Sequence, residues 1–332
     1  MNLTYTRRDI FTMLGAAAAA ASYSPPLFAA SGKPMRGAFI IMATPYTDAN
    51  EIDHEDLAGE VDFLHRCGAQ GMVWPQFASE YPNLKKEERF EGMETLAKAA
   101  KGKKPALVLG VQAPNIDEMI EVARYAEKLQ PDAVIAMPPK EAKSLDDYRA
   151  YYGALCKLAK RPVFIQTTGG TDGVEPTVEF IIEMATKYPN FGYVKEEHKP
   201  VLERLIKMSK HRPSPIKSLF GGAAGRAWPY EMRYGFDGTM PGAMYSDIYA
   251  QLWEFHEQGK WDEIRDLFAK LLLMINLDEH IPGVRNYVFK RRGIFKTAKS
   301  RRGDYTWSQE AVSEIEHNLA ALAPHFRVKL PA

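Results

Sequence analysis

The chain has 332 residues, of which 45% are hydrophobic and 26% charged, so it is long enough for one large domain or two ordinary ones. Its 43 basic and 42 acidic residues leave a formal net charge of +1, which gives no field that would attract nucleic acid or an anionic membrane. Its two cysteines, Cys67 and Cys156, are too few for a disulfide framework or a zinc site, and we expect buried free thiols.

The first 30 residues have the pattern of an export signal. Arg7 and Arg8 precede a weakly apolar run with six consecutive alanines, Ala16 to Ala21. Paired arginines before such a run are typical of a twin-arginine signal, and the run is shorter than the about 20 residues that span a bilayer. We therefore expect residues 1–30 to be a signal peptide. The mature protein would be periplasmic or secreted, with no stable membrane association after cleavage. The alternative is a cytoplasmic protein with an alanine-rich tail.

From Gly37 onward, short apolar runs alternate with helix-length amphipathic segments. Continuous apolar runs are typical of parallel strands covered on both faces. Between them Asp53 and Asn115 precede helical patterns, and Gly68 stands at a helix stop. The strands are predicted at residues 38–42, 71–74, 106–110, 133–137, 162–166, 192–195, 216–220 and 238–240.

Eight strand–helix units predict an α/β fold, a (β/α)8 TIM barrel over residues of about 37–258. No Gly-x-Gly-x-x-Gly follows the first strand, which argues against a dinucleotide-binding fold. After the eighth unit, residues of about 260–323 have the pattern of three helices. We expect this segment to be a C-terminal extension of the barrel, in a single domain over residues 35–325.

Lys195 ends the sixth predicted strand. In a barrel of this kind the reacting groups lie where strands end and the following loops begin. Burial there penalises the ammonium form of the lysine and favours the free amine that attacks a ketone. The alternative is that Lys195 is a solvated residue that marks a strand end.

Three features recur at matching positions in one family: Thr44-Pro45 after the first strand, the lysine of Tyr193-Val194-Lys195-Glu196, and Gly221-Gly222 after the seventh strand. With its three-helix C-terminus, the chain resembles the dihydrodipicolinate synthase / N-acetylneuraminate lyase family of Schiff-base aldolases and dehydratases. The resemblance implies that Lys195 forms an imine with pyruvate or another 2-oxo acid. It implies no cofactor, because the protonated imine is itself the electron sink. It also implies a homo-oligomer, a tetramer or a dimer.

The loop after the second strand departs from the family pattern. The family has Gly-Thr-Thr-Gly-Glu, whose hydroxyls and amides hold the substrate carboxylate, whereas this chain has Gln76-Phe77-Ala78-Ser79-Glu80. Both threonines are lost, and Ser79 either supplies one hydroxyl or is a turn residue. By position, the resemblance assigns substrate binding to Thr44, Phe77, Ala78, Ser79, Glu80, Gly221 and Gly222.

The family tyrosine that relays protons is missing after the fourth strand, where Lys140 stands. Lys140 either points into the mouth, where its charge would lower the pKa of Lys195 or bind a carboxylate, or lies in solvent beside Glu141. After the fifth strand, Thr167 and Thr168 stand near the position of a family Tyr-Asn pair. They either replace the missing hydroxyl relay or are ordinary loop residues. The predicted catalytic set is Lys195, Lys140 and Thr167.

Three further features of the sequence bear on its chemistry. Between Arg285 and Arg302 lie eight basic residues and no acidic one, which fits a polyanion site, a solvated helical face or a subunit contact. The histidines form no His-x-x-x-His pair, so no metal site is predicted. Glu197 and His198 are either an acid or base beside Lys195 or the acidic start of a helix.

The sequence thus predicts an exported lyase, either a carbon–carbon aldolase or a hydro-lyase, that acts on a 2-oxo acid or sugar acid through an imine on Lys195. The lost threonines, the missing tyrosine and the export signal argue against dihydrodipicolinate synthesis itself. No nucleic-acid partner is expected. The alternative hypothesis is a non-catalytic sugar-acid-binding protein on an aldolase scaffold, because a fold does not fix a function.

Overall fold

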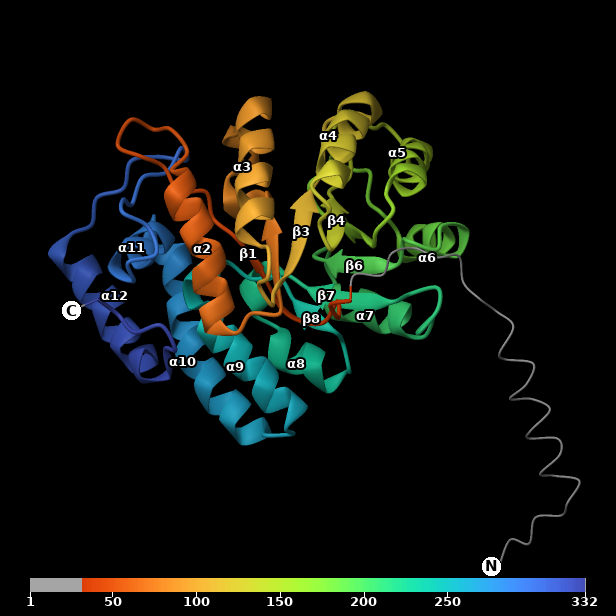
Figure 1. Cartoon of the computed structure of the whole chain (residues 1–332). Coiled ribbons are helices and arrows are strands. Elements are labelled where there is room, and N and C mark those ends of the chain that lie inside the picture. Colours follow the sequence, from red (N-terminus) through yellow and green to blue (C-terminus); the bar gives the residue numbers. More distant parts are fainter. Residues whose placement is uncertain (1–31, 332) are drawn as a thin grey trace, which may run out of the picture.

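A computed structural model describes residues 32–331, so the predicted signal peptide lies outside the described residues. Eight parallel strands follow one another around a closed barrel, and β1 pairs with β8 to close it (Figure 1). This confirms the predicted (β/α)8 fold. The strands are β1 (Gly37–Ile41), β2 (Gly71–Trp74), β3 (Ala106–Gly110), β4 (Ala133–Ala136), β5 (Val163–Gln166), β6 (Tyr193–Glu196), β7 (Ser218–Gly221) and β8 (Gly238–Thr239).

Helices follow the strands and surround the barrel (Figure 1). Helix α2 begins after Asp53, whose carboxylate accepts hydrogen bonds from two backbone N–H groups of the first turn, and it ends at Gly68 with a φ of 83°. Helix α6 begins after Thr177, whose hydroxyl accepts a hydrogen bond from the Phe180 N–H. The barrel helices are α2 (His54–Cys67), α3 (Lys86–Ala99), α4 (Ile116–Lys128), α5 (Leu145–Leu158), α6 (Val178–Lys187), α7 (Val201–Ser209), α8 (Trp228–Arg233) and α9 (Ser246–Glu257).

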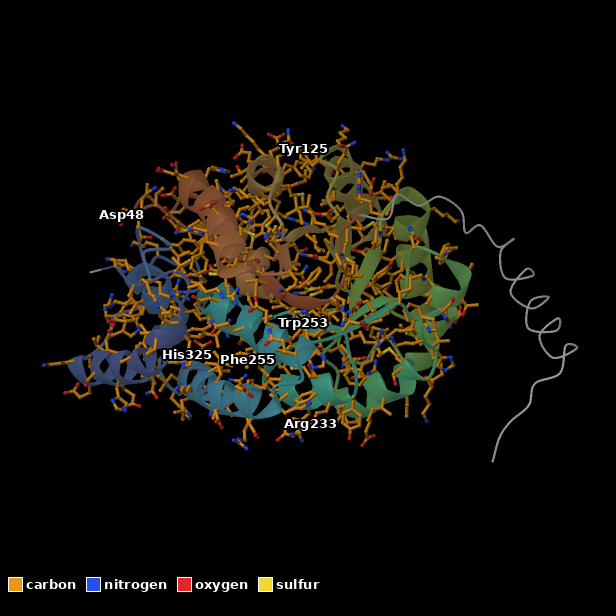
Figure 2. All side chains as sticks on the ribbon, turned by 60° about the horizontal axis from the view of Figure 1, so that its bottom comes forward. Asp48, Tyr125, Arg233, Trp253, Phe255 and His325 are labelled. Carbon is orange, nitrogen blue, oxygen red and sulfur yellow. The ribbon has the colours of Figure 1, made fainter. Side chains whose placement is uncertain are left out.

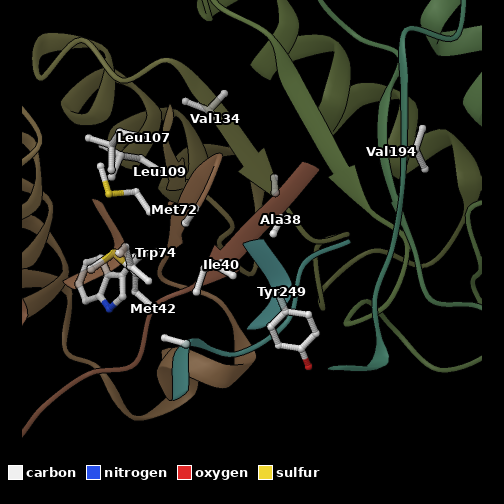
Figure 3. Packing of buried hydrophobic residues seen from close by; sticks show 14 of the residues in the cluster. Ala38, Ile40, Met42, Met72, Trp74, Leu107, Leu109, Val134, Val194 and Tyr249 are labelled. Carbon is white, nitrogen blue, oxygen red and sulfur yellow. The ribbon is translucent and has the colours of Figure 1, made fainter. Parts of the chain in front are cut away.

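The two faces of the strands form two separate cores. Inside the barrel, Phe39, Phe164 and Phe220 pack with ring centroids 5.0 to 6.3 Å apart, and smaller aliphatic side chains fill the space around them. Outside the barrel, alternate residues of the same strands pack against the helices (Figure 3). This alternation decides which side chains of each strand point toward the mouth.

Three helices extend the barrel after α9, as predicted: α10 (Trp261–His280), α11 (Val284–Arg291) and α12 (Gln309–Leu322). Helix α10 packs against α9 and α12. Figure 2 shows Trp253 and Phe255 on α9, the barrel helix that α10 covers. The extension therefore packs against α9, the last helix of the barrel (Figure 1).

The basic segment of the extension makes ion pairs with the rest of the chain. Lys296 reaches carboxylates at the start of α2, and Arg301 pairs with Glu88 of α3 at 2.6 Å. These contacts attach the extension to the barrel, an outcome that the sequence alone did not suggest.

Cys67 and Cys156 are buried free thiols, as expected. Within residues 32–331, none of the helices combines the length and hydrophobicity that crossing a bilayer requires.

Candidate active site

Lys195 projects into the barrel because of its position on β6. Val194 belongs to the core outside the strands, whereas Tyr193 packs against the core inside the barrel. Since side chains alternate along a strand, Lys195 shares the inward face with Tyr193, one step nearer the carboxyl end. Lys195 is 3% exposed. Its amine is therefore held inside the mouth, where the reacting groups of such barrels lie.

Two polar groups of the described chain contact this amine. Gln166, the neighbour of Lys195 in the β5–β6 register, accepts a hydrogen bond from Nζ at 2.9 Å. Glu197 places Oε2 3.3 Å from Nζ and forms an ion pair with it. Since a buried charge without a partner is costly, the carboxylate offsets the desolvation of the ammonium.

Glu197 is itself held from three sides. Its Oε2 also accepts a hydrogen bond from the Thr168 hydroxyl at 2.9 Å, and its Oε1 accepts one from the Ala223 N–H at 3.1 Å. Burial alone would raise the pKa of Glu197, but the Lys195 charge and these hydrogen bonds outweigh it, so the pKa is lowered. Glu197 is consequently a carboxylate beside the amine at neutral pH.

A cavity of about 170 Å³ adjoins Lys195. Its walls come from the ends of β1, β5, β6 and β8, the loops after β2 and β7, and helices α9, α10 and α11. The site thus combines the barrel mouth with the C-terminal extension. Its polar lining consists of Gln166, Lys195, Glu197, Tyr245, Tyr249, Asp278 and Arg285.

The segment after β8 contributes Tyr245 to the cavity wall. Tyr245 is buried, and its hydroxyl has no hydrogen-bond partner within the described part of the chain. Burial raises the pKa of Tyr245 well above its usual value, so it remains a protonated donor. By contrast, Tyr249 donates to the Ala224 carbonyl at 2.7 Å, and Arg285 forms an ion pair with Asp278. Tyr245 therefore offers the cavity a free donor.

The loop after β2 divides into residues that line the cavity and residues that hold the loop. Phe77 and Ala78 line the cavity. Thr44 donates to the Ser79 carbonyl at 2.6 Å, and the Ser79 hydroxyl donates to the Met42 carbonyl. Glu80 accepts hydrogen bonds at 2.6 Å and 2.9 Å from two residues of the C-terminal extension. Thr44, Ser79 and Glu80 therefore position the loop and do not line the cavity.

Thr167 lies outside the cavity. Its neighbour Thr168, rather than Thr167, contacts a residue of the site. The Thr167 hydroxyl donates to Glu196 at 2.6 Å, on the outward side of β6, where Glu196 pairs with Arg204 at 2.9 Å. Thr168 instead contacts Glu197. The two threonines differ because successive side chains of an extended backbone point to opposite faces, and this alternation continues beyond the end of β5.

Gly221 and Gly222 act through their lack of side chains. A Cβ at Gly221 would collide with the Glu231 carboxyl, and a Cβ at Gly222 would collide with the Glu197 carboxyl. The next residues, Ala223 and Ala224, line the cavity. The two glycines thus leave room for acidic side chains.

Lys140 does not meet Lys195. It is exposed and lines a different cavity of about 280 Å³, formed by the loops after β2, β3 and β4. Phe77 lines both cavities. A direct effect of the Lys140 charge on the Lys195 amine is not supported by this arrangement.

Sequence reasoning missed Tyr245 and named Arg285 only as part of a basic segment, because no motif marks them for this site and both come from segments after the last strand. It named Glu197 as either an acid or base beside Lys195 or the acidic start of a helix, and α7 begins only at Val201. Its separation from Lys195 by two residues was the available signal, since residues i and i+2 of an extended chain share a face. Within residues 32–331 no three His, Cys, Asp or Glu side chains are grouped so as to hold a metal ion.

Fold and site define a parallel (β/α)8-barrel protein with a buried amine at its mouth. The model of the dihydrodipicolinate synthetase family matches residues 34–322, and the chain belongs to this family.

Individual relatives are distant. The 4-hydroxy-tetrahydrodipicolinate synthase of Rhizobium meliloti is 26% identical over 162 residues, 48% of this chain and 55% of that protein, so the match spans about half of the relative. The enzyme of the same name from Porphyromonas gingivalis is 22% identical over 264 residues, 77% of this chain and 87% of the relative.

Solved structures agree with the fold. The dihydrodipicolinate synthase of Rhodopseudomonas palustris superposes with a TM-score of 0.76 at 23% identity, covering 86% of this chain and 97% of that one. The 4-hydroxy-tetrahydrodipicolinate synthase of Methylacidiphilum fumariolicum gives a TM-score of 0.78 at 17% identity, with 89% and 100% covered.

Proposed function

We propose that the protein is a Schiff-base lyase that binds a short 2-oxo acid as an imine on Lys195. The observation that carries the proposal is the buried Lys195 amine, held between Gln166 and Glu197 at the wall of a cavity. Once the amine loses its proton, its lone pair attacks the C2 carbonyl of the acid. The resulting protonated imine accepts the electron pair that is released when a bond at the neighbouring carbon breaks.

The size of the cavity favours a compact substrate. Its volume of about 170 Å³ lies below the about 300–1,000 Å³ of pockets that hold drug-sized ligands. Pyruvate and similar 2-oxo acids are of this size, whereas a long sugar acid would extend out of the cavity. The chemistry needs no cofactor in this scheme, because the imine performs the electron-accepting role.

The carboxylate of the acid needs a donor that replaces the two lost threonines. Tyr245 has a protonated hydroxyl, buried and unpaired among the described residues, on the wall of the same cavity. A buried donor without an acceptor is costly, so a carboxylate oxygen is a favourable partner. We assign Tyr245 to substrate binding.

Borohydride trapping tests the proposal. Incubation with pyruvate and reduction should add one reduced pyruvate to the peptide that contains Lys195. Lys217 is the matched control, because burial lowers its pKa but it lies outside the cavity. Lys195→Arg should keep a cation beside Glu197 and form no adduct.

The rival, a binding protein without turnover, makes a different prediction. It would bind 2-oxo acids with unchanged affinity after Lys195→Ala and would show no adduct in the wild type. That pair of results would remove the lyase proposal.

We further propose that the twin-arginine sequence at residues 1–30 exports the protein. Fusion of this segment to a reporter that is active only after export should give a signal, and Arg7→Lys with Arg8→Lys should abolish it.

A further inference from the structure

Glu196 and Glu197 are adjacent, but they have different surroundings. Glu196 faces away from the barrel interior, where Arg204 at 2.9 Å and the Thr167 hydroxyl at 2.6 Å occupy its oxygens. Glu197 faces the cavity and contacts the Lys195 amine at 3.3 Å. The first glutamate is therefore part of a structural ion pair, and the second is available to the site.

The local structure fixes the Glu197 carboxylate in place. The Thr168 hydroxyl and the Ala223 N–H donate hydrogen bonds to its two oxygens. Gly222 has no side chain, and a Cβ there would collide with the Glu197 carboxyl. A carboxylate fixed this way cannot rotate away from the amine without losing these hydrogen bonds. Its oxygen is within reach of a proton on Nζ and of an oxygen bound to the carbon that Nζ attacks.

We infer that Glu197 is the catalytic residue that carries protons between the Lys195 amine and the oxygen of the substrate during imine formation. This inference rests on the proposed function. It gives the role of the missing tyrosine to a carboxylate two residues from the nucleophile.

Glu197 takes one proton from the Lys195 ammonium, and the amine lone pair forms a bond to C2 while the carbonyl π pair moves to oxygen. A second proton passes from nitrogen to that oxygen and gives the carbinolamine. Glu197 then returns its proton to the hydroxyl, the C–O bond breaks, water leaves, and the nitrogen lone pair completes the C=N bond. The carboxylate is ionised at the start and at the end.

The other titratable groups that face the cavity are less suited to this task. Tyr245 resists ionisation because burial raises its pKa, Tyr249 donates to the Ala224 carbonyl, and Asp278 is paired with Arg285. Among the described acidic side chains, Glu197 is the one that forms an ion pair with Lys195.

The rate of imine formation with pyruvate tests the inference. Timed samples are quenched in borohydride, and the reduced adduct is measured by intact-protein mass spectrometry. We expect Glu197→Gln to slow the wild-type rate about 100-fold or more, the usual effect of removing an acid–base group. Glu127→Gln, a matched change in a half-buried ion pair on helix α4, should leave the rate unchanged.

Two further readouts separate chemistry from structure. The wild-type rate should fall toward low pH as both the Lys195 amine and Glu197 take up protons, whereas Glu197→Gln should keep only the part of the fall that belongs to Lys195, because Asp278, Tyr245, Tyr249 and Arg285 are unchanged. In Glu197→Ala, added formate should restore at least 10-fold of the lost rate by entering the vacated space. A structural role would show neither effect.

The outcomes are distinguishable. A wild type that forms adduct, together with a Glu197→Gln variant of equal rate and equal pH profile, would overturn this inference and leave the lyase proposal intact. A wild type without adduct would overturn both. If Glu197→Gln does not fold, formate rescue of Glu197→Ala and the rate of imine formation in Glu197→Asp test the role of Glu197 instead. Absence of rescue counts against the inference.

Discussion

Arg292 of the extension and Asp247 of α9 form a buried two-point ion pair. The guanidinium nitrogens lie 3.1 Å and 2.8 Å from the two carboxylate oxygens, and both side chains are almost fully enclosed. The pair joins the last barrel helix to the segment that closes the Lys195 cavity. The extension is therefore fixed to the barrel by a charge contact shielded from solvent.

Asp247→Asn should lower the free energy of unfolding by about 3–5 kcal/mol, because it leaves the Arg292 charge buried without a counter-charge. Urea denaturation followed by circular dichroism measures this. Asp262→Asn is the matched control, since its pair with Arg265 is exposed and should change stability by less than about 1 kcal/mol. Equal effects of the two changes would contradict the expectation.

Tyr245→Phe should raise the stability of the protein while weakening pyruvate binding. The substitution removes a buried hydroxyl that lacks a partner among the described residues, and such a group costs about 1–3 kcal/mol. Thermal denaturation and the pyruvate concentration that gives half-maximal adduct measure the two effects.

Tyr46→Phe is the control for these two effects on stability and on pyruvate binding. The Tyr46 hydroxyl is also buried and unpaired in the described chain, but it does not line the cavity. It should gain stability and keep pyruvate binding. Weakened binding in both variants would remove the role assigned to Tyr245.

Gly222→Ala should lower the rate of imine formation at least 10-fold, because the added Cβ would displace the Glu197 carboxylate from the amine. Timed borohydride quenching measures the rate. Gly59→Ala, where an added Cβ meets open space, should leave the rate unchanged and stabilise α2 by about 0.5–1 kcal/mol. A Gly222→Ala variant with normal kinetics would show that the carboxylate has more freedom than its contacts indicate.

Glu231 should make stability depend on pH. Burial raises the pKa of Glu231 to about 8, from an ordinary value of 4.5. Between these values the folded protein holds the proton and the unfolded chain does not, so this group's contribution to stability is full below about pH 4.5 and is lost as pH rises toward 8. The slope is at most about 1.4 kcal/mol per pH unit.

Glu231→Gln should remove this slope, so the variant should gain on the wild type as pH rises from about 5 to about 8. Urea denaturation across this range measures the difference. Glu179→Gln, on the exposed face of α6, should differ from the wild type in its free energy of unfolding by the same amount at every pH in this range. A constant difference for Glu231→Gln as well would contradict the raised pKa.

The fold was accessible from the sequence because its signals are local. Continuous apolar runs mark the strands, and Asp53 and Gly68 mark the ends of α2 by hydrogen bonding and backbone preference. The inward direction of Lys195 also follows from strand alternation. These features need no knowledge of distant contacts.

The composition of the site was less accessible. Tyr245 and Arg285 share a cavity with Lys195 because segments distant in sequence pack together. The spacing of residues in the sequence does not predict such packing. The choice between Thr167 and Thr168 depends on a single step of backbone alternation past a strand end. The direction of Lys140 depends on how the loop after β4 packs, and the structure places that lysine in the neighbouring cavity.

The cavity takes its buried amine from β6 and one wall from α10 and α11. The amine and the enclosing wall can therefore change independently during evolution or engineering. Substitutions at Ile275, Asp278 or Arg285 would alter which molecules enter while the contacts of Lys195 with Gln166 and Glu197 stay intact. New specificities can arise on this scaffold without disturbing the strands that hold the amine.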